Sequence, residues 1–269
     1  MNPAPPTWSM PPRWTAESLR NGLAVITLSV VVLICLAASG FTIDSLIRGL
    51  PRMSRLAGQM IPPDFSRFPA IVRSLGVTTQ IALAGTGLGI VLSIPLSVLA
   101  SRSHSLTIGM SFVVQSGLAL LRTIPELVWA IVFVACLGPG AMAGILAIMV
   151  DTVGFAGRFF AGAIDDCDRG PQEALTSLGA RRWQILLGAV LPAALPALIH
   201  TAIYALERAI RASVVLGIVG AGGIGIELKV SMELFEFRRA SAIMLSILVV
   251  VLIVELVGST VRRRLLSTT

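Results

Sequence analysis

Charged side chains interrupt several segments that are otherwise long and apolar. Arg122 and Glu126 stand four residues apart around Pro125. Residues four apart share one face of a helix, so such a pair could simply neutralise itself inside a membrane. Alternatively, the arginines line a path for an anion, because a guanidinium binds phosphate-like oxygens in a bidentate fork. Both interpretations stay open for the charged residues within apolar segments, namely Arg122, Glu126, Asp151, Glu207, Arg208 and Arg211.

The composition places those residues in a membrane protein. The 269 residues are 55% hydrophobic and 13% charged, and the mean hydropathy is +0.88. A soluble core of this size does not need so much apolar surface. A spanning helix needs roughly 20 apolar residues, and backbone groups in hydrocarbon must pair within the helix. We therefore predict an all-α integral membrane protein with about six transmembrane helices, at Leu23–Ser39, Leu75–Ala100, Ile108–Leu137, Ala141–Ile164, Pro192–Val219 and Ala240–Val261.

The spans divide the chain into four predicted parts. These are a cytoplasmic N-terminal tail (1–21), a first transmembrane helix with an external loop (22–74), a main transmembrane domain (75–262) and a cytoplasmic C-terminal tail (263–269). This orientation keeps the Arg run at 262–264 inside. The first span resembles a signal peptide, but nothing after it looks like a secreted soluble domain, so we expect a retained anchor.

The predicted external loop is unexpectedly basic, with Arg48, Arg52 and Arg55 among its residues. One interpretation is a segment at the membrane surface, with Leu46 and Leu50 on its apolar side. The other is that the charge attracts an anion to an entrance. Composition and periodicity favour the first interpretation.

A polar loop at about 165–191 separates the fourth and fifth spans. Pro171 suits a first helical turn, and Gly179 suits a helix end, so a short surface helix is predicted. Such a helix could seat in a groove on another protein and transmit force, or it could be an ordinary amphipathic re-entry helix. The docking hypothesis assigns this coupling role to Glu173, Ala174, Leu175, Gly179, Ala180 and Arg181.

A glycine-rich segment at 217–225 contains the spacing Gly-x-Gly-x-x-Gly. A dinucleotide fingerprint requires a strand before it and a βαβ unit around it, whereas this segment leaves an apolar helix. A tight external turn or a close helix approach is the better interpretation. The functional version is an outer gate or a contact for a binding protein, made by Gly220, Gly222, Gly223 and Gly225.

Other chemistry finds little support in the sequence. The phosphate loop Gly-x-x-x-x-Gly-Lys-[Ser/Thr] does not occur, so an energy source would come from another polypeptide. His104 and His200 lie far apart and the three cysteines have no paired spacing, so neither a metal site nor a disulfide is expected. The net charge of +7 sits in loops between spans and does not indicate nucleic acid. No catalytic residue or cofactor is predicted in this chain.

Four segments together resemble the phosphonate-type (PhnE-like) permeases of bacterial ABC importers. They are 121–130, the loop around Glu173, 211–217 and 219–228; the loop departs from the family pattern at Leu175 and Ala189. The resemblance implies a type I importer permease fold with a cytoplasmic coupling helix, in the bacterial cytoplasmic membrane. It also implies a second permease chain, identical or related, two cytoplasmic ATPase subunits that bind ATP and Mg, and an extracytoplasmic solute-binding protein. The implied cargo is a phosphonate or related phosphorus oxyanion.

Three alternatives remain. Methionine-type permeases share the docking loop and a glycine-rich segment, although the arginines favour an anion over a zwitterion. A secondary transporter could use Glu126, Asp151 or Glu207 as proton sites. A membrane scaffold without transport is disfavoured by the many charges within spans.

Overall fold

The computed structural model describes residues 16–105 and 107–266, and every regular element in these ranges is helical. Residues 1–15 of the predicted N-terminal tail and 267–269 of the predicted C-terminal tail lie outside the described residues. Five helices are long and apolar enough to cross a membrane, and a bent pair would make a sixth. They are α1 (Ala16–Ala38), α3 (Phe68–Ala100), α6 (Ala141–Asp165), α9 (Leu191–Ile218) and α11 (Phe237–Leu266), with α4 (Ile108–Thr123) and α5 (Glu126–Leu137) as the pair.

The chain divides into two compact units at Gly58, and each is described separately. The first unit contains α1 and most of α2 (Ile43–Met60). Leu46, Leu50 and Arg48 are all exposed in α2, and Arg48 pairs with Asp44 one turn earlier. The predicted segment at the membrane surface is therefore helical, with a basic side and an apolar side.

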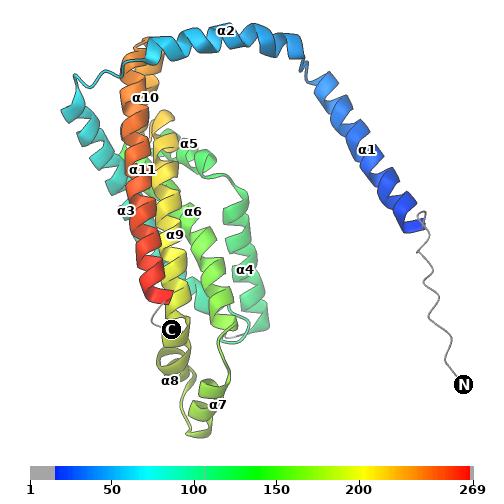
Figure 1. The fold of residues 1–269 in the computed structure, drawn as a ribbon. Coiled ribbons are helices and arrows are strands. Elements are labelled where there is room, and N and C mark those ends of the chain that lie inside the picture. The colour runs from blue at the N-terminus through cyan, green and yellow to red at the C-terminus, as the bar shows by residue number, and fades with distance from the viewer. Residues whose placement is uncertain (1–15, 106, 267–269) are drawn as a thin grey trace, which may run out of the picture. The chain divides into compact units, whose positions relative to one another are not determined.

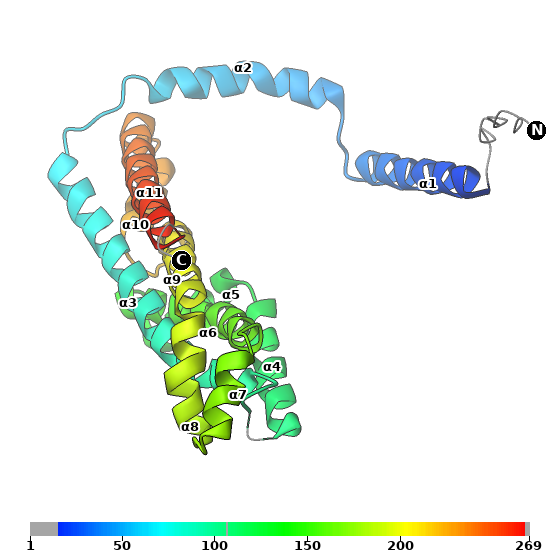
Figure 2. The same ribbon diagram turned by 60° about the horizontal axis from the view of Figure 1, so that its bottom comes forward.

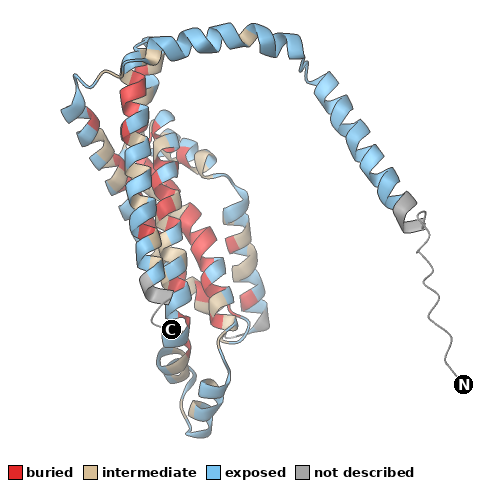
Figure 3. Cartoon of the chain, in the orientation of Figure 1, coloured by how far each residue is buried: buried red, intermediate tan, exposed pale blue. Residues whose placement is uncertain are grey.

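Helix α6 is the centre of the second unit. Figure 3 shows buried residues concentrated along it, among them Ala147, Ile148 and Phe160. Helices α3, α4, α5 and α9 all pack against it. The approach of α3 is close because Gly85 and Gly89, one turn apart, have no side chains. A Cβ atom at Gly89 would lie 2.5 Å from the Cβ of Thr152. Small residues at this spacing are typical of membrane helix interfaces.

The third predicted span, Ile108–Leu137, is broken into two helices in the structure. Helix α4 ends at Thr123, and α5 begins at Glu126 with its axis turned by 84°. Ile124 is extended, with φ −83° and ψ 120°, as expected for a residue before proline. Pro125 also lacks the N–H that would continue the helix. By contrast, Pro95 lies inside α3, which continues to Ala100.

Two short helical regions mark opposite ends of the second unit. In Figures 1 and 2, α7 (Gly170–Ser177) and α8 (Arg182–Ile185) project from one end, and α10 (Ile224–Glu233) lies at the other. A π-helical segment (Leu186–Val190) joins α8 directly to α9. The predicted docking loop thus continues without interruption into a membrane-spanning helix.

Candidate functional site

The predicted docking loop folds into a defined helix with a defined end. The amide of Gly170 donates to Asp168 Oδ1 over 3.2 Å at the start of α7. Gly179 adopts φ +80°, a conformation that glycine reaches without steric penalty. The amide of Gly179 donates to the Thr176 carbonyl, and the amide of Ala180 donates to the Leu175 carbonyl, both over 3.0 Å. This is the Schellman arrangement that closes a helix C-terminus.

The outer surface of α7 is open to a partner. Glu173 and Ala174 are exposed, and Leu178, which follows the helix, is 83% exposed. Leu175 is half-buried and faces the π-helical segment, close to Gly188. The departure from the family pattern at Leu175 therefore lies on the packed side of the helix. Among the other predicted docking residues, Arg181 is exposed and Ala180 is half-buried.

Three of the predicted path residues form one ionic cluster between helices. Arg208 of α9 donates to Asp151 of α6 over 2.7 Å and to Glu126 at the start of α5 over 3.5 Å. The Arg208 guanidinium also lies 5.3 Å from the centre of the Phe155 ring, a cation–π distance. Two carboxylates thus surround one guanidinium, which leaves Arg208 engaged within the protein.

Two pairs of oppositely charged residues with a spacing of four, Arg122 and Glu126 and also Glu207 and Arg211, do not form ion pairs with each other. Arg122 and Glu126 belong to different helices because the span breaks between them. Glu207 pairs with Arg262 of α11 over 2.6 Å and not with Arg211, one turn along its own helix. Arg211 is exposed, and among the described residues it takes part in no ion pair. Neutralisation within one helix, one of the two interpretations left open by the sequence, therefore does not occur for Glu126 or Glu207, whose partners lie on other helices.

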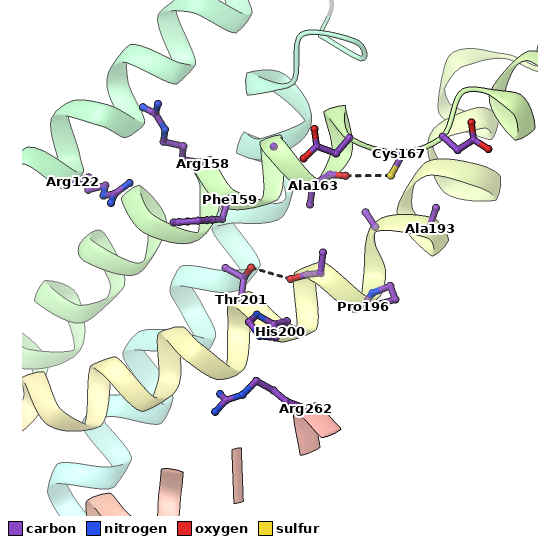
Figure 4. A pocket seen from close by; sticks show the side chains of 15 residues that line it. Arg122, Arg158, Phe159, Ala163, Cys167, Ala193, Pro196, His200, Thr201 and Arg262 are labelled. Atoms are coloured by element: carbon purple, nitrogen blue, oxygen red, sulfur yellow. Dashed lines mark hydrogen bonds between the residues drawn. The ribbon is translucent and has the colours of Figure 1, made fainter. Parts of the chain in front are cut away.

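A cavity of about 810 Å³ lies next to the docking loop, between the end of α6 and the start of α9. Its basic lining residues are Arg122, Arg158, His200 and Arg262. Figure 4 shows Arg122 and Arg158 on one side of the cavity, with His200 and Arg262 on another. Asp166, Asp168 and Cys167 line it as well. Burial raises the pKa of the Cys167 thiol, and the charge of Asp166 acts in the same direction.

Arg122 and Arg158 differ from Arg208 in their contacts. The Arg122 guanidinium lies 5.8 Å from the centre of the Phe159 ring. Both arginines are exposed, and within residues 16–105 and 107–266 neither forms an ion pair. An oxyanion entering the cavity would therefore find guanidinium groups whose donors are not occupied by carboxylates.

The glycine-rich segment makes a tight turn between α9 and α10. Gly220, Gly222 and Gly223 have φ values of +99°, +92° and +77°. The Gly220 carbonyl accepts from the amide of Gly140 over 2.9 Å, which ties the turn to the α5–α6 connection. A Cβ atom at Gly225 would lie 2.1 Å from the Val214 carbonyl oxygen. The predicted tight turn and close helix approach are thus both present, and the gate or binding-protein contact stays a prediction.

Comparisons with known proteins agree with this architecture. Residues 93–267 match the family described as binding-protein-dependent transport system inner membrane component. The chain belongs to this family. It is 40% identical over 245 residues to the phosphite transport system permease protein PtxC of Stutzerimonas stutzeri, covering 90% of this chain and 88% of the relative. It is 37% identical over 208 residues to the phosphate-import permease protein PhnE of Mycolicibacterium smegmatis, covering 77% of this chain and 39% of that relative.

The fold is also that of a solved ABC importer. The inward-facing MetNI methionine ABC transporter matches with a TM-score of 0.66 and 24% identity, covering 75% of this chain and 99% of that chain. The permease is therefore a multi-pass protein of the bacterial inner membrane with the type I importer permease fold, and the predictions of family, fold and location are confirmed.

Sequence reasoning missed two features of the permease. Arg262 was assigned only to the basic C-terminal run, yet it neutralises the buried Glu207. Asp165 was assigned only to the loop start, yet it accepts four hydrogen bonds from the connection between α3 and α4. Both partners are more than 50 residues distant along the chain. Local spacing carries no signal for such pairs.

Proposed function

We propose that this permease imports a phosphorus oxyanion, such as a phosphonate, phosphite or phosphate, by ATP-driven alternating access. The observation that carries the proposal is the cavity beside the docking loop, where Arg122 and Arg158 present unpaired guanidinium groups among the described residues. Guanidinium forks match the oxygens of such anions. The named cargo of the two relatives, phosphite and phosphate, supports the same chemistry.

The proposed function requires several partner subunits around the permease. Two permease chains, identical or related, would form the route, and a cytoplasmic ATPase subunit would seat on the α7 helix of each. ATP and Mg would bind to those ATPases and not to this chain. A solute-binding protein would deliver the anion at the outer side. Closure of the ATPase pair would move α7 and switch the spans between inward and outward openings.

A methionine permease is the second candidate, because the methionine importer shares the fold. Its permease is 24% identical to this chain, compared with 40% for the phosphite permease. The unpaired arginines also favour an anion over a zwitterion. A secondary carrier that uses Glu126 or Asp151 as a proton site is disfavoured, because both side chains already contact Arg208.

The deciding experiment is ATP hydrolysis by the complete transporter in lipid, with its ATPase and binding protein present. Methylphosphonate, phosphite, phosphate and methionine are compared as stimulants. Stimulation by a phosphorus oxyanion is expected, and stimulation by methionine alone would overturn the substrate. Glu173→Lys should keep the permease in the membrane and abolish stimulation, whereas full stimulation in that variant would refute the docking role of α7.

A further inference from the structure

The side chain of Asp165 fastens the end of α6 to the connection between α3 and α4. Asp165 Oδ1 accepts from the hydroxyl groups of Ser101 (2.7 Å) and Ser103 (2.6 Å) and from the Ser103 amide (3.1 Å). Asp165 Oδ2 accepts from the Arg102 amide over 3.1 Å. Ser101 itself is fully buried. One carboxylate therefore satisfies four donors of a short loop, and hydrogen bonds to a charged acceptor are among the stronger ones in proteins.

The same loop is fastened to α4. The Ala100 carbonyl, at the end of α3, accepts from the Ser111 hydroxyl over 2.7 Å and from Gln115 Nε2 over 2.8 Å. Both donors lie in the first half of α4, whose other end carries Arg122 and the break before α5. These two hydrogen bonds connect the end of α3, where the loop begins, to the helix that ends at the break.

The other side of the loop faces the docking helix. His104 and Ser105 line a cavity of about 400 Å³ together with Gln172 and Thr176 of α7. Asp165 also lies only five residues before the first residue of α7. The loop between α3 and α4 is therefore held at the base of the docking helix and borders its side.

We propose that Asp165 is a positioning residue that carries the movement of α7 into α4, and so to the broken span beside Arg122. This inference rests on the proposed function, because it assumes that a partner ATPase moves α7. The movement is transmitted by the four hydrogen bonds of Asp165 and by the two hydrogen bonds to the Ala100 carbonyl. Loss of the Asp165 bonds lets α7 move without moving α4, so ATP hydrolysis continues while transport falls.

Asp165→Asn tests the inference, because the amide has nearly the same shape as the carboxylate. An Asn amide cannot accept with both ends, so at least one donor among the loop groups faces another donor. The matched control is Glu255→Gln in α11, since Glu255 is exposed, lies outside the cavities described above and takes part in no hydrogen bond or ion pair with the described residues. The complete transporter in lipid is assayed for anion uptake and for ATP hydrolysis under the same conditions.

We expect Asp165→Asn to lower the anion taken up per ATP hydrolysed by about tenfold, a size typical of coupling between two sites. The control should keep the wild-type ratio. Ser103→Ala, at an exposed position, removes one of the four bonds and should give an intermediate ratio even if the Asn variant fails to assemble.

Wild-type ratios in both Asp165→Asn and Ser103→Ala would overturn the inference. A proportional fall of uptake and hydrolysis would also overturn it, because that result describes a purely structural role. A wild-type transporter whose hydrolysis drives no anion uptake would instead overturn the proposed function.

Discussion

Replacing Arg208 with Met should strongly destabilise the permease, because two carboxylates then lose their shared cation. The side chain of Asp151 is 12% exposed and that of Glu126 is 29% exposed. Met has a similar length and a flexible thioether, so contact with the Phe155 ring is retained. The loss is thus mainly electrostatic.

The magnitude follows from the geometry. Removing one partner of a buried ion pair reduces the free energy of unfolding by about 3–5 kcal/mol. Arg208 is 32% exposed and its contact with Glu126 is long, at 3.5 Å, so the lower end applies. We expect a reduction of about 3 kcal/mol, or about 6–12 °C in Tm for a domain of this size. Asp151→Asn keeps an acceptor for Arg208 and should lose only about 1 kcal/mol.

The assay is a double-mutant cycle of thermal unfolding in one detergent. In the double variant Asp151→Asn/Arg208→Met, the Asp151 carboxylate that would lack a cation is itself removed. The loss in free energy of unfolding should therefore be smaller than the sum of the two single losses by about 2 kcal/mol. Arg211→Met, one turn along α9 and exposed, is the control and should change stability by less than about 0.5 kcal/mol. Additive losses within error would refute the ion cluster as a stabilising unit.

Two further predictions concern packing and pH. Gly89→Val should reduce the free energy of unfolding by at least about 1–3 kcal/mol, because the new side chain would push α3 away from Thr152. The control is Gly87→Val, which should have little effect because a Cβ atom at Gly87 meets no atom within 4 Å. Equal Tm values for the two variants would contradict the packing argument. Burial lowers the pKa of His104 below its usual value of 6.5, although the negative charge of Asp165 acts in the opposite direction. As the pH falls, the imidazole of the unfolded chain is therefore protonated before that of the folded chain. The free energy of unfolding consequently decreases as the pH drops through about 6.5. Comparing Tm at pH 7.5 and 5.5 should therefore show a smaller acid loss in His104→Gln, and equal losses would show that another group is responsible.

Most of the fold was readable from the sequence because hydropathy reports directly on burial in lipid. The predicted span Ala141–Ile164 corresponds to α6, and the predicted Pro192–Val219 corresponds to α9, within one residue at each end. The break in the third span was not predicted, because hydropathy reports how apolar a segment is and carries no information about the direction of the helix axis. Pro125 lies at the break, but whether a proline kinks a helix or ends it depends on what the next segment can pack against. Here Ala130 of α5 is fully buried in the same core cluster as Ala147 of α6, which holds the new direction.

The helix α7 was predictable from the sequence and the ion pairs were not, for related reasons. The signals for α7 are local, because Pro171 and Gly179 act on the backbone within one turn. Charge pairing inside a membrane is decided between helices. Glu207 pairs with Arg262 because α11 packs beside α9, and Gly258 of α11 has no side chain that would occupy the position of the Glu207 carboxylate. The rule that residues four apart form pairs was measured on isolated helices and describes exposed side chains. It does not predict the partner of a buried side chain when an oppositely charged residue of a neighbouring helix lies closer.

The ion cluster also limits which arginines can serve an anion. With both carboxylates ionised, Arg208, Asp151 and Glu126 carry a formal charge of −1, so the cluster would repel a phosphorus oxyanion. On the proposed function, the route must therefore depend on cations outside the cluster. Arg122 and Arg158 meet that requirement and line the cavity next to the docking loop. On the proposed function, an anion that has passed the negatively charged cluster is attracted towards Arg122 and Arg158, on the side of the permease where α7 would contact an ATPase.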